Sequence, residues 1–252
     1  MEIVFIARLT LMKNILVIAD PYNNEQIAYS TALKLASYSS ARVHVAAFCY
    51  ESINTDTQSG EGSLKEKLIQ YQLQWWDKYI QQTSSETEVS CEVVWEKYLH
   101  VWVLNHCKEE HYDLVVKTGH RSESPFHTPT DWQLFRDSTV PIYSVYEEAH
   151  KSKKNVLVAL DILTDNQDKQ DMNRRLLEEA FRFSVLTCAT LHCCYAIKIT
   201  AIVKELELVD VASHAHQQED AARIRFKELM DEYDIKDENL HIKEGTPWKV
   251  VA

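Results

Sequence analysis

The chain contains the stretch Asn14-Ile15-Leu16-Val17-Ile18-Ala19-Asp20, and the same pattern returns as Asn155-Val156-Leu157-Val158-Ala159-Leu160-Asp161. Each copy is a short apolar run that ends in an aspartate, which is typical of a strand buried inside a parallel sheet. The match continues beyond this strand, because Val43-His44-Val45-Ala46 aligns with Leu191-His192-Cys193-Cys194. A repeat of this length indicates a duplicated domain rather than a solenoid, whose units are about 20–50 residues long.

Apolar runs and segments with helical spacing alternate along both copies. With connections this short, the alternation predicts an α/β fold, in which each copy is an open parallel sheet with helices on both faces. The expected strands cover residues 15–19, 43–48, 89–95, 114–117 and 142–145 in the first copy, and 156–160, 190–196 and 240–243 in the second.

The repeat predicts two domains, at residues 12–147 and 155–252, with a charged linker at 148–154. Residues 1–11 are expected to be an N-terminal extension, since this apolar run is too short to span a bilayer. The first domain continues past the position that matches residue 252 by a helix, two strands and another helix. We therefore expect the second domain to be incomplete at its C-terminal end.

Composition narrows the classes of partner. The net charge is −11 and there is no long run of Lys and Arg, which argues against direct binding to nucleic acid or to an anionic membrane surface. The six cysteines include no CxxC pair, so we expect buried free thiols and a location in the reducing cytoplasm.

The residues at the turns resemble those of the universal stress protein family, and of its tandem-domain E type in particular. The first copy contains Gly119-His120-Arg121, followed by Thr128-Pro129-Thr130-Asp131-Trp132-Gln133-Leu134. The second copy contains Glu244-Gly245-Thr246-Pro247 after its third expected strand. The likeness covers residues 12–252, and the Thr-Pro-Thr-Asp-Trp-Gln-Leu string is its most specific part.

This resemblance implies a Rossmann-like sheet of five strands per domain, of the adenine nucleotide alpha hydrolase-like type. It also implies a non-enzymatic protein with a role in surviving stress, including DNA damage. Relatives pair through their last strands, so an incomplete second domain would leave residues 142–145 as an open edge. An open edge strand favours self-association.

Ligand-binding residues follow from the same resemblance. In the family, the aspartate that ends the first strand contacts a nucleoside, which makes Asp20 and Asp161, with the adjacent Ile162, candidates for ligand contact. Both aspartates lie at the carboxyl edge of the sheet, where open α/β sheets bind ligands. The alternative is that each aspartate only caps a helix or turn. Gly119 and His120 are further candidates, at the start of the loop that follows the fourth expected strand.

ATP binding is not expected in the first domain. Nucleotide-binding relatives carry Gly-x2-Gly-x9-Gly-Ser/Thr, whose glycines let backbone N–H groups approach phosphates. Here Gly119 matches the first glycine, but Ser122 replaces the second and Trp132-Gln133 stands where Gly-Ser/Thr should be. The matching segment of the second domain would lie beyond residue 252, which leaves its capacity for nucleotide open.

No metal site and no catalytic residues are expected. His-x-His at residues 214 and 216 would point its rings to different sides of a helix, and His192 stands between apolar strand residues. No nucleophile elbow, metalloprotease or Walker motif occurs. The apolar connection at 197–216 either covers a ligand cleft or packs on its own sheet.

The sequence leaves three functions open. The first is a cytoplasmic stress-response protein that binds a small apolar or nucleotide-like ligand through its second domain. The second is a nucleotide-binding or weakly ATP-hydrolysing protein that acts through Asp161. The third is an interaction scaffold that uses the edge at residues 142–145.

Overall fold

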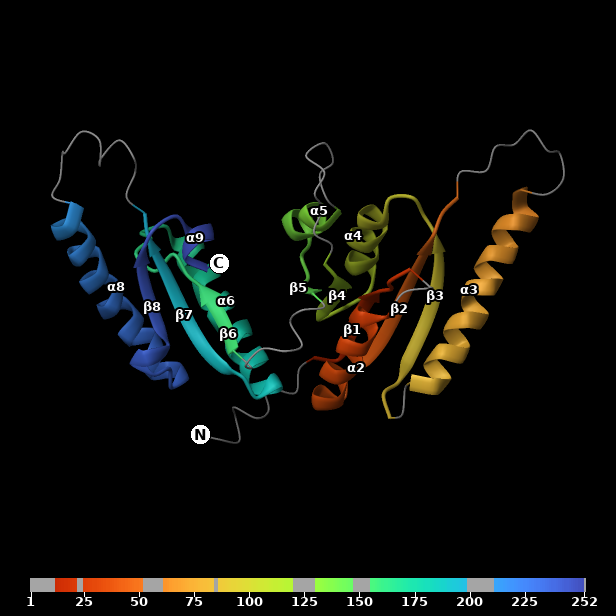
Figure 1. The fold of residues 1–252 in the computed structure, drawn as a ribbon, viewed down its shortest axis with the longest axis horizontal. Coiled ribbons are helices and arrows are strands. Elements are labelled where there is room, and N and C mark those ends of the chain that lie inside the picture. The colour runs from red at the N-terminus through yellow and green to blue at the C-terminus, as the bar shows by residue number, and fades with distance from the viewer. Residues whose placement is uncertain are drawn as a thin grey trace. The chain divides into compact units, whose positions relative to one another are not determined.

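The computed structural model describes residues 12–21, 25–51, 61–83, 86–119, 130–146, 155–198 and 211–251. The extension predicted at 1–11, the linker at 148–154 and His120 lie outside these ranges, as does most of the connection at 197–216. The chain divides into two compact units, Met1–Ser152 and Lys153–Ala252, each of which is described by itself (Figure 1).

The first unit contains a five-stranded sheet in the order β3-β2-β1-β4-β5. All of its neighbouring strands are parallel, which confirms the predicted fold class. The strands are β1 (Asn14–Ile18), β2 (Arg42–Cys49), β3 (Val89–Trp95), β4 (Leu114–Thr118) and β5 (Ile142–Val145).

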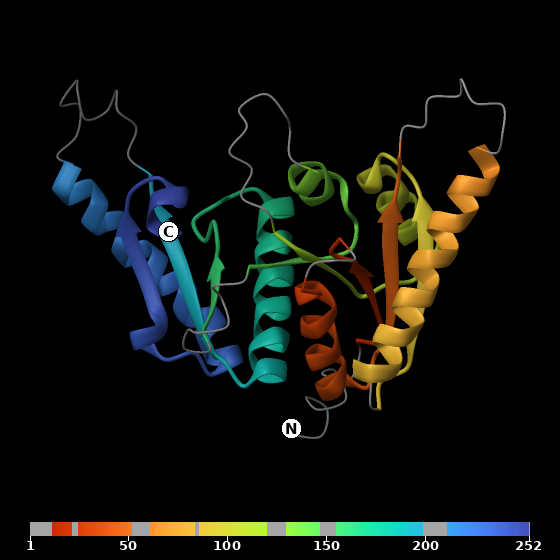
Figure 2. The ribbon, with the colours of Figure 1, turned by 45° about the vertical axis from the view of Figure 1, so that its right-hand side comes forward.

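Helices cover both faces of this sheet (Figures 1 and 2). They are α2 (Ile27–Ser39), α3 (Glu61–Thr83), α4 (Leu99–Glu109) and α5 (Thr130–Asp137). Tyr29 of α2 meets Trp76 of α3 edge to face, with 5.5 Å between ring centroids. On the other face, Val103 of α4 and Leu134 of α5 join one apolar core with Leu16 of β1.

The second unit has a parallel sheet in the order β6-β7-β8 within its described residues. Phe226 and Leu177 are fully buried in its core and come from the two long helices. The elements are β6 (Asn155–Ala159), α6 (Gln167–Thr187), β7 (Thr190–Ile197), α8 (Val211–Tyr233), a short 3-10 helix (Asp237–Asn239), β8 (Leu240–Glu244) and α9 (Pro247–Val251).

The two copies of the repeated strand differ in burial. Leu16 of β1 is 0% exposed, whereas its counterpart Leu157 of β6 is 43% exposed. The burial predicted for the strand at residues 15–19 is thus found in β1 and is not repeated at this position of β6. The reason is its position: β1 lies between β2 and β4, whereas β6 pairs only with β7 among the described residues.

A membrane-spanning helix is not found in the part of the chain that the structure describes, since none of its helices combines the necessary length and apolar character.

Candidate ligand site at the end of the first strand of each unit

The site begins where the strand order of the first unit reverses. β1 and β4 are neighbours, and the chain leaves them for helices on opposite faces of the sheet. In open α/β sheets, the crevice outside the carboxyl ends of two such strands is the usual place for a ligand. Here Asp20 follows β1, while Thr118 ends β4 and Gly119 follows it.

Asp20 uses its carboxylate within the protein. The residue is only 8% exposed, and Oδ2 accepts a 2.8 Å hydrogen bond from the Thr118 hydroxyl. The same oxygen accepts a longer bond of 3.4 Å from the backbone N–H of Ala28, in the first turn of α2. These contacts tie the loop after β1 to β4 and cap the helix. They match the capping alternative for Asp20.

A buried amide also holds the backbone of this loop. Gln26 is fully buried, and its Oε1 accepts from the backbone N–H of Asp20 at 3.1 Å. Its Nε2 donates to the carbonyls of Asp20 and Pro21, both at 3.2 Å. Because buried backbone groups must be hydrogen-bonded, this amide fixes the path of the chain as it leaves β1.

The second unit fixes the same backbone with a different residue. The N–H of Asp161 donates to Oδ1 of Asn173 at 3.2 Å, and Nδ2 of Asn173 donates to the Asp161 carbonyl at 2.9 Å. Asn173 is buried and comes from the second turn of α6 rather than from the residue before the helix. The two units thus reach the same backbone arrangement from different positions in the sequence.

The carboxylate of Asp161 has a different environment from that of Asp20. The Asp161 side chain is 48% exposed, and Oδ2 lies 3.2 Å from Nζ of Lys169, which is itself exposed. Such an exposed ion pair contributes little and breaks easily. Asp161 is therefore available to a ligand, whereas Asp20 is already bonded within its own unit.

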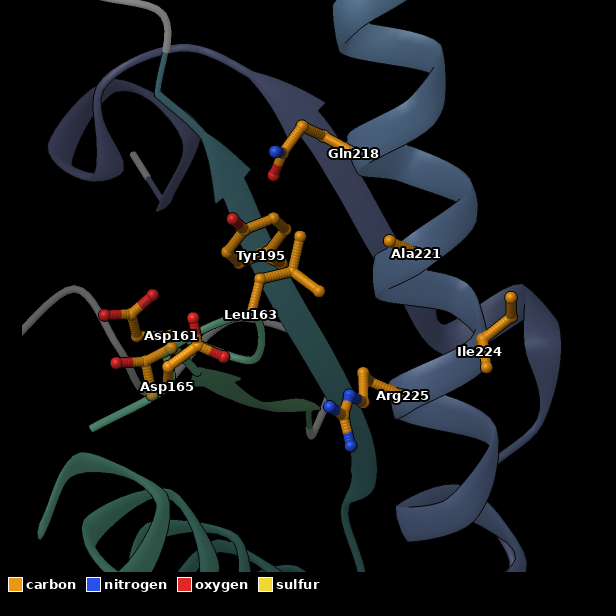
Figure 3. Close-up of a pocket in the computed structure, with 9 residues that line it drawn as sticks. Asp161, Leu163, Asp165, Tyr195, Gln218, Ala221, Ile224 and Arg225 are labelled. Carbon is orange, nitrogen blue, oxygen red and sulfur yellow. The ribbon is translucent and has the colours of Figure 1, made fainter. Parts of the chain in front are cut away.

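Asp161 lines a cavity of about 530 Å³. The cavity lies between the loop after β6, strand β7 and helix α8, as Figure 3 shows. A volume of this size is in the usual range for small-molecule sites. The lining residues are Asp161, Leu163, Thr164, Asp165, Tyr195, Gln218, Ala221, Ile224 and Arg225.

The walls of the cavity differ in chemistry. Asp161 and Asp165 provide carboxylates from the loop, and Arg225 extends a guanidinium from α8 (Figure 3). Tyr195 of β7 provides a half-buried ring whose hydroxyl has a raised pKa, mainly because of burial and secondarily because of Asp161. The phenol is thus a neutral donor and acceptor of hydrogen bonds at neutral pH.

The other predicted site residues have different positions. Ile162 packs against the core of the second unit and does not line the cavity. Gly119 lies under an aromatic ring: a Cβ at this position would collide with the Tyr146 ring and come within 2.5 Å of Oγ of Ser144. Close packing by its own chain therefore accounts for the glycine. His120 lies outside the described residues.

Sequence reasoning missed Tyr195, Gln218 and Arg225. Tyr195 follows the apolar pair Cys193-Cys194 and reads as part of a buried strand. Gln218 and Arg225 are seven positions apart on α8, and this spacing places them on one face. The sequence thus indicates that the two residues share a helix face, but it does not show that this face lines a cavity.

The six cysteines are free thiols. Burial raises the pKa of Cys193 to about 12, so its thiol stays protonated at neutral pH. His192 faces a second imidazole, with 3.0 Å between its Nδ1 and Nε2 of His241. His216 is exposed, and the side chain of His214 lies outside the described residues.

Comparisons with known proteins add the family context. No family model matches the chain. A universal stress protein E homolog of Haemophilus influenzae is 24% identical over 257 residues, covering 95% of this chain and 82% of that protein.

Two crystal structures share the fold. A candidate universal stress protein from Pseudomonas aeruginosa has a TM-score of 0.65 at 20% identity, covering 95% of this chain and 76% of the other. A universal stress protein from Archaeoglobus fulgidus has a TM-score of 0.61 at 14% identity, covering 96% and 80%. The predicted resemblance to tandem universal stress proteins of the E type is confirmed.

Proposed function

Since this chain resembles universal stress protein E along nearly its whole length, we propose that it is a stress-response protein that binds a small ligand beside Asp161. One observation carries the proposal. The two repeated aspartates have the same backbone setting, but the Asp20 carboxylate is bonded internally, while that of Asp161 is exposed and lines a cavity.

The cavity favours a ligand with both hydroxyl groups and a flat apolar part. Asp161 and Asp165 are carboxylates, which accept hydrogen bonds from hydroxyls. Tyr195 and Leu163 offer apolar surface between the loop and α8. Arg225 adds a cation that can take an anionic group. A nucleoside or nucleotide has these features, so this nucleotide-like class is our choice over a purely apolar ligand.

The first unit is proposed not to bind ATP. The ring of Tyr146 and the hydroxyl of Ser144 occupy the space next to Gly119, where a phosphate loop would need open backbone. In addition, the Asp20 carboxylate is committed to Thr118 and to α2. Binding of a nucleotide-like ligand is thus proposed for the second unit and not for the first.

The test is isothermal titration calorimetry of the whole chain with adenosine and with ATP. Asp161→Ala removes a charged acceptor, whose hydrogen bond contributes roughly 1.5–3 kcal/mol, so Kd should rise about 10- to 100-fold. Asp220→Asn is the matched control, because Asp220 is an exposed acid of α8 that does not line the cavity. The control should bind as the unaltered chain does.

Two results would contradict the proposal. Saturable binding that survives Asp161→Ala but is lost in Asp20→Ala would place the ligand in the first unit. Failure of both adenosine and ATP to bind at millimolar concentration would exclude the nucleoside class for this cavity.

The finer features of the proposed role follow from the family likeness. We propose that the protein works without catalysis in the cytoplasm, that it supports survival of stress including DNA damage, and that it does not contact DNA directly. The last point rests on the net charge of −11. Incubation with ATP should release no phosphate above the rate of a heat-denatured sample.

A second candidate function is self-association through β5. This strand is last in its sheet and pairs only with β4 among the described residues. Its remaining edge can accept a strand from another copy. The carbonyls of Pro141, just before β5, and of Val145 accept hydrogen bonds from the β4 side of the sheet, so the backbone donor of Ser144 faces the open edge. Sedimentation velocity at increasing concentration tests the idea: Ser144→Pro, which removes this donor, should abolish any association.

A further inference from the structure

A cluster of three potential metal ligands lies in the first unit, away from the cavity of the second. His44 comes from β2, Glu92 from β3 and His106 from α4. In the sheet register, His44 pairs with Ser90, and Ala46 pairs with Glu92. Because paired residues of parallel strands share a face, His44 and Glu92 project on the same side of the sheet. His106 reaches them from the helix that covers this face.

The donor atoms are close enough to share one ion. Oε1 of Glu92 lies 2.8 Å from Nε2 of His44 and 3.8 Å from Nε2 of His106. The candidate ligand atoms all lie within 4.8 Å of one another. Metal–ligand bonds of about 2.0–2.2 Å around a tetrahedral ion separate its donors by about 3.3–3.5 Å. The separations of 2.8 Å and 3.8 Å lie on either side of this value, and the widest separation in the cluster, at most 4.8 Å, would shorten by up to about 1.5 Å on binding.

Neighbouring groups orient both imidazoles. Nδ1 of His44 lies 2.8 Å from the hydroxyl of Ser90, which turns Nε2 toward Glu92. The ring of His106 stacks on Trp102, with 4.2 Å between centroids. Ligating histidines in metal sites are held by such outer contacts, which set the tautomer and the ring direction.

Tyr112 lies beside the nitrogen of His106 that faces the cluster. Its hydroxyl is 3.0 Å from Nε2 of His106. A metal ion at Nε2 would replace this hydrogen bond, and the hydroxyl would then be placed to bond to a metal-bound water.

The cluster is partly shielded but still accessible. The side chains of His44 and His106 are 23% and 19% exposed, and that of Glu92 is 39% exposed. Partial burial limits competition from water, and the open side leaves room for entry of an ion and for a fourth, water ligand.

We propose that His44, Glu92 and His106 bind one divalent transition-metal ion of the Zn²⁺ class. Two imidazoles and a carboxylate are a donor set that Zn²⁺ accepts with water in the fourth position. The absence of a thiolate and the single carboxylate disfavour both soft ions and Mg²⁺ or Ca²⁺. Within the described residues, no other group of three such side chains comes together.

The second unit provides an internal comparison. Cys194 pairs with His241 there as Ala46 pairs with Glu92, so His241 occupies the sheet position of Glu92. It faces His192, the counterpart of His44. This pair has no carboxylate, and the described residues offer it no third ligand. We expect it to bind metal more weakly than the cluster of the first unit.

The experiment uses the whole chain, freed of metal by chelation and titrated with Co²⁺ as a spectroscopic substitute for Zn²⁺. We expect one ion per chain, visible bands of tetrahedral cobalt without thiolate charge-transfer bands, and displacement by Zn²⁺. Quenching of Trp102 fluorescence should accompany binding, since its ring stacks on His106. Trp102→Phe should remove that quenching and keep the visible bands.

Variants locate the ion. Glu92→Gln and His106→Gln should each weaken binding at least 100-fold, and Ser90→Ala should weaken it about 10-fold through the orientation of His44. His192→Gln is the matched control and should leave the affinity unchanged. Circular dichroism melts confirm that each variant is folded; Ser90→Ala keeps all three ligands in case another variant unfolds.

Three results would overturn the proposal. Cobalt bands with strong thiolate charge transfer would assign the ion to cysteines. Loss of binding in His192→Gln, but not in Glu92→Gln, would assign it to the second unit. No saturable binding by a folded chain would mean that the cluster is a metal-free hydrogen-bonded network.

Discussion

Replacing Gln26 tests whether one buried amide fixes the loop that carries Asp20. Gln26→Ala removes three hydrogen bonds, to the N–H and carbonyl of Asp20 and to the carbonyl of Pro21. A net contribution of roughly 0.5–1.5 kcal/mol per bond gives a loss of about 1.5–4.5 kcal/mol. The upper part of this range is expected, since Gln26 is fully buried and its partners would be left unpaired.

Urea unfolding followed by tryptophan fluorescence measures this loss in the right unit. Five of the six tryptophans precede residue 153, so the signal reports mainly on the first unit. With a urea dependence of about 1–3 kcal/mol per molar, the midpoint should fall by roughly 1–2 M. Gln70→Ala, at an exposed position of α3, is the control and should leave the midpoint nearly unchanged.

Unfolding of Gln26→Ala and Gln70→Ala at the same urea concentration would refute a stabilising role for the Gln26 amide. That outcome would mean that water or a rearranged loop replaces the amide at no cost. A change in the slope of the transition, rather than in its midpoint, would point to an effect on the unfolded chain instead.

Three further measurements test other parts of the structure. Gly119→Ala should destabilise the first unit by about 1–3 kcal/mol because the new methyl group collides with Tyr146, and adding Tyr146→Ala should recover part of the loss in urea unfolding. Burial lowers the pKa of His241, so the unfolded chain binds a proton at this residue at a higher pH than the folded chain does. The stability should therefore be full above pH 6.5 and fall as the pH drops below this value. His241→Gln should flatten this dependence in thermal melts at successive pH values. With a thiol reagent at neutral pH, the exposed Cys188 should react at once, whereas the buried Cys193, whose pKa is about 12, should react only in denaturant. Immediate labelling of Cys193 in the native protein would contradict its burial.

The strands were predictable because their signal is local. The apolar run at residues 15–18 is long enough for a strand and too short for most helices, and the repeat at 156–159 supports it from a second copy. The same local pattern does not give the same burial in β6, because Leu157 lies in a strand that pairs on one side only among the described residues. Burial depends on neighbours in space, which a single segment does not specify.

The candidate sites were predictable only in part. The position of Asp161 at the edge of the sheet follows from chain order, but its exposed carboxylate does not, since Asp20 has the same local sequence setting. The difference arises from Thr118, which is distant in sequence and reaches Asp20 through β4. Likewise, His44 and His106 share no local motif, and only the packing of α4 on the sheet brings them together.

The amide of Asn173 has a consequence for how the second unit can change. It holds Asp161 by the backbone alone, so the turn does not depend on which side chain stands at position 161. A substitution there can change the lining of the cavity with little risk to folding, whereas a substitution at Asp20 would remove its bonds to Thr118 and to α2. The second copy can therefore vary at this position while the first keeps its aspartate for structure, and position 161 is where we would begin to alter the proposed ligand specificity.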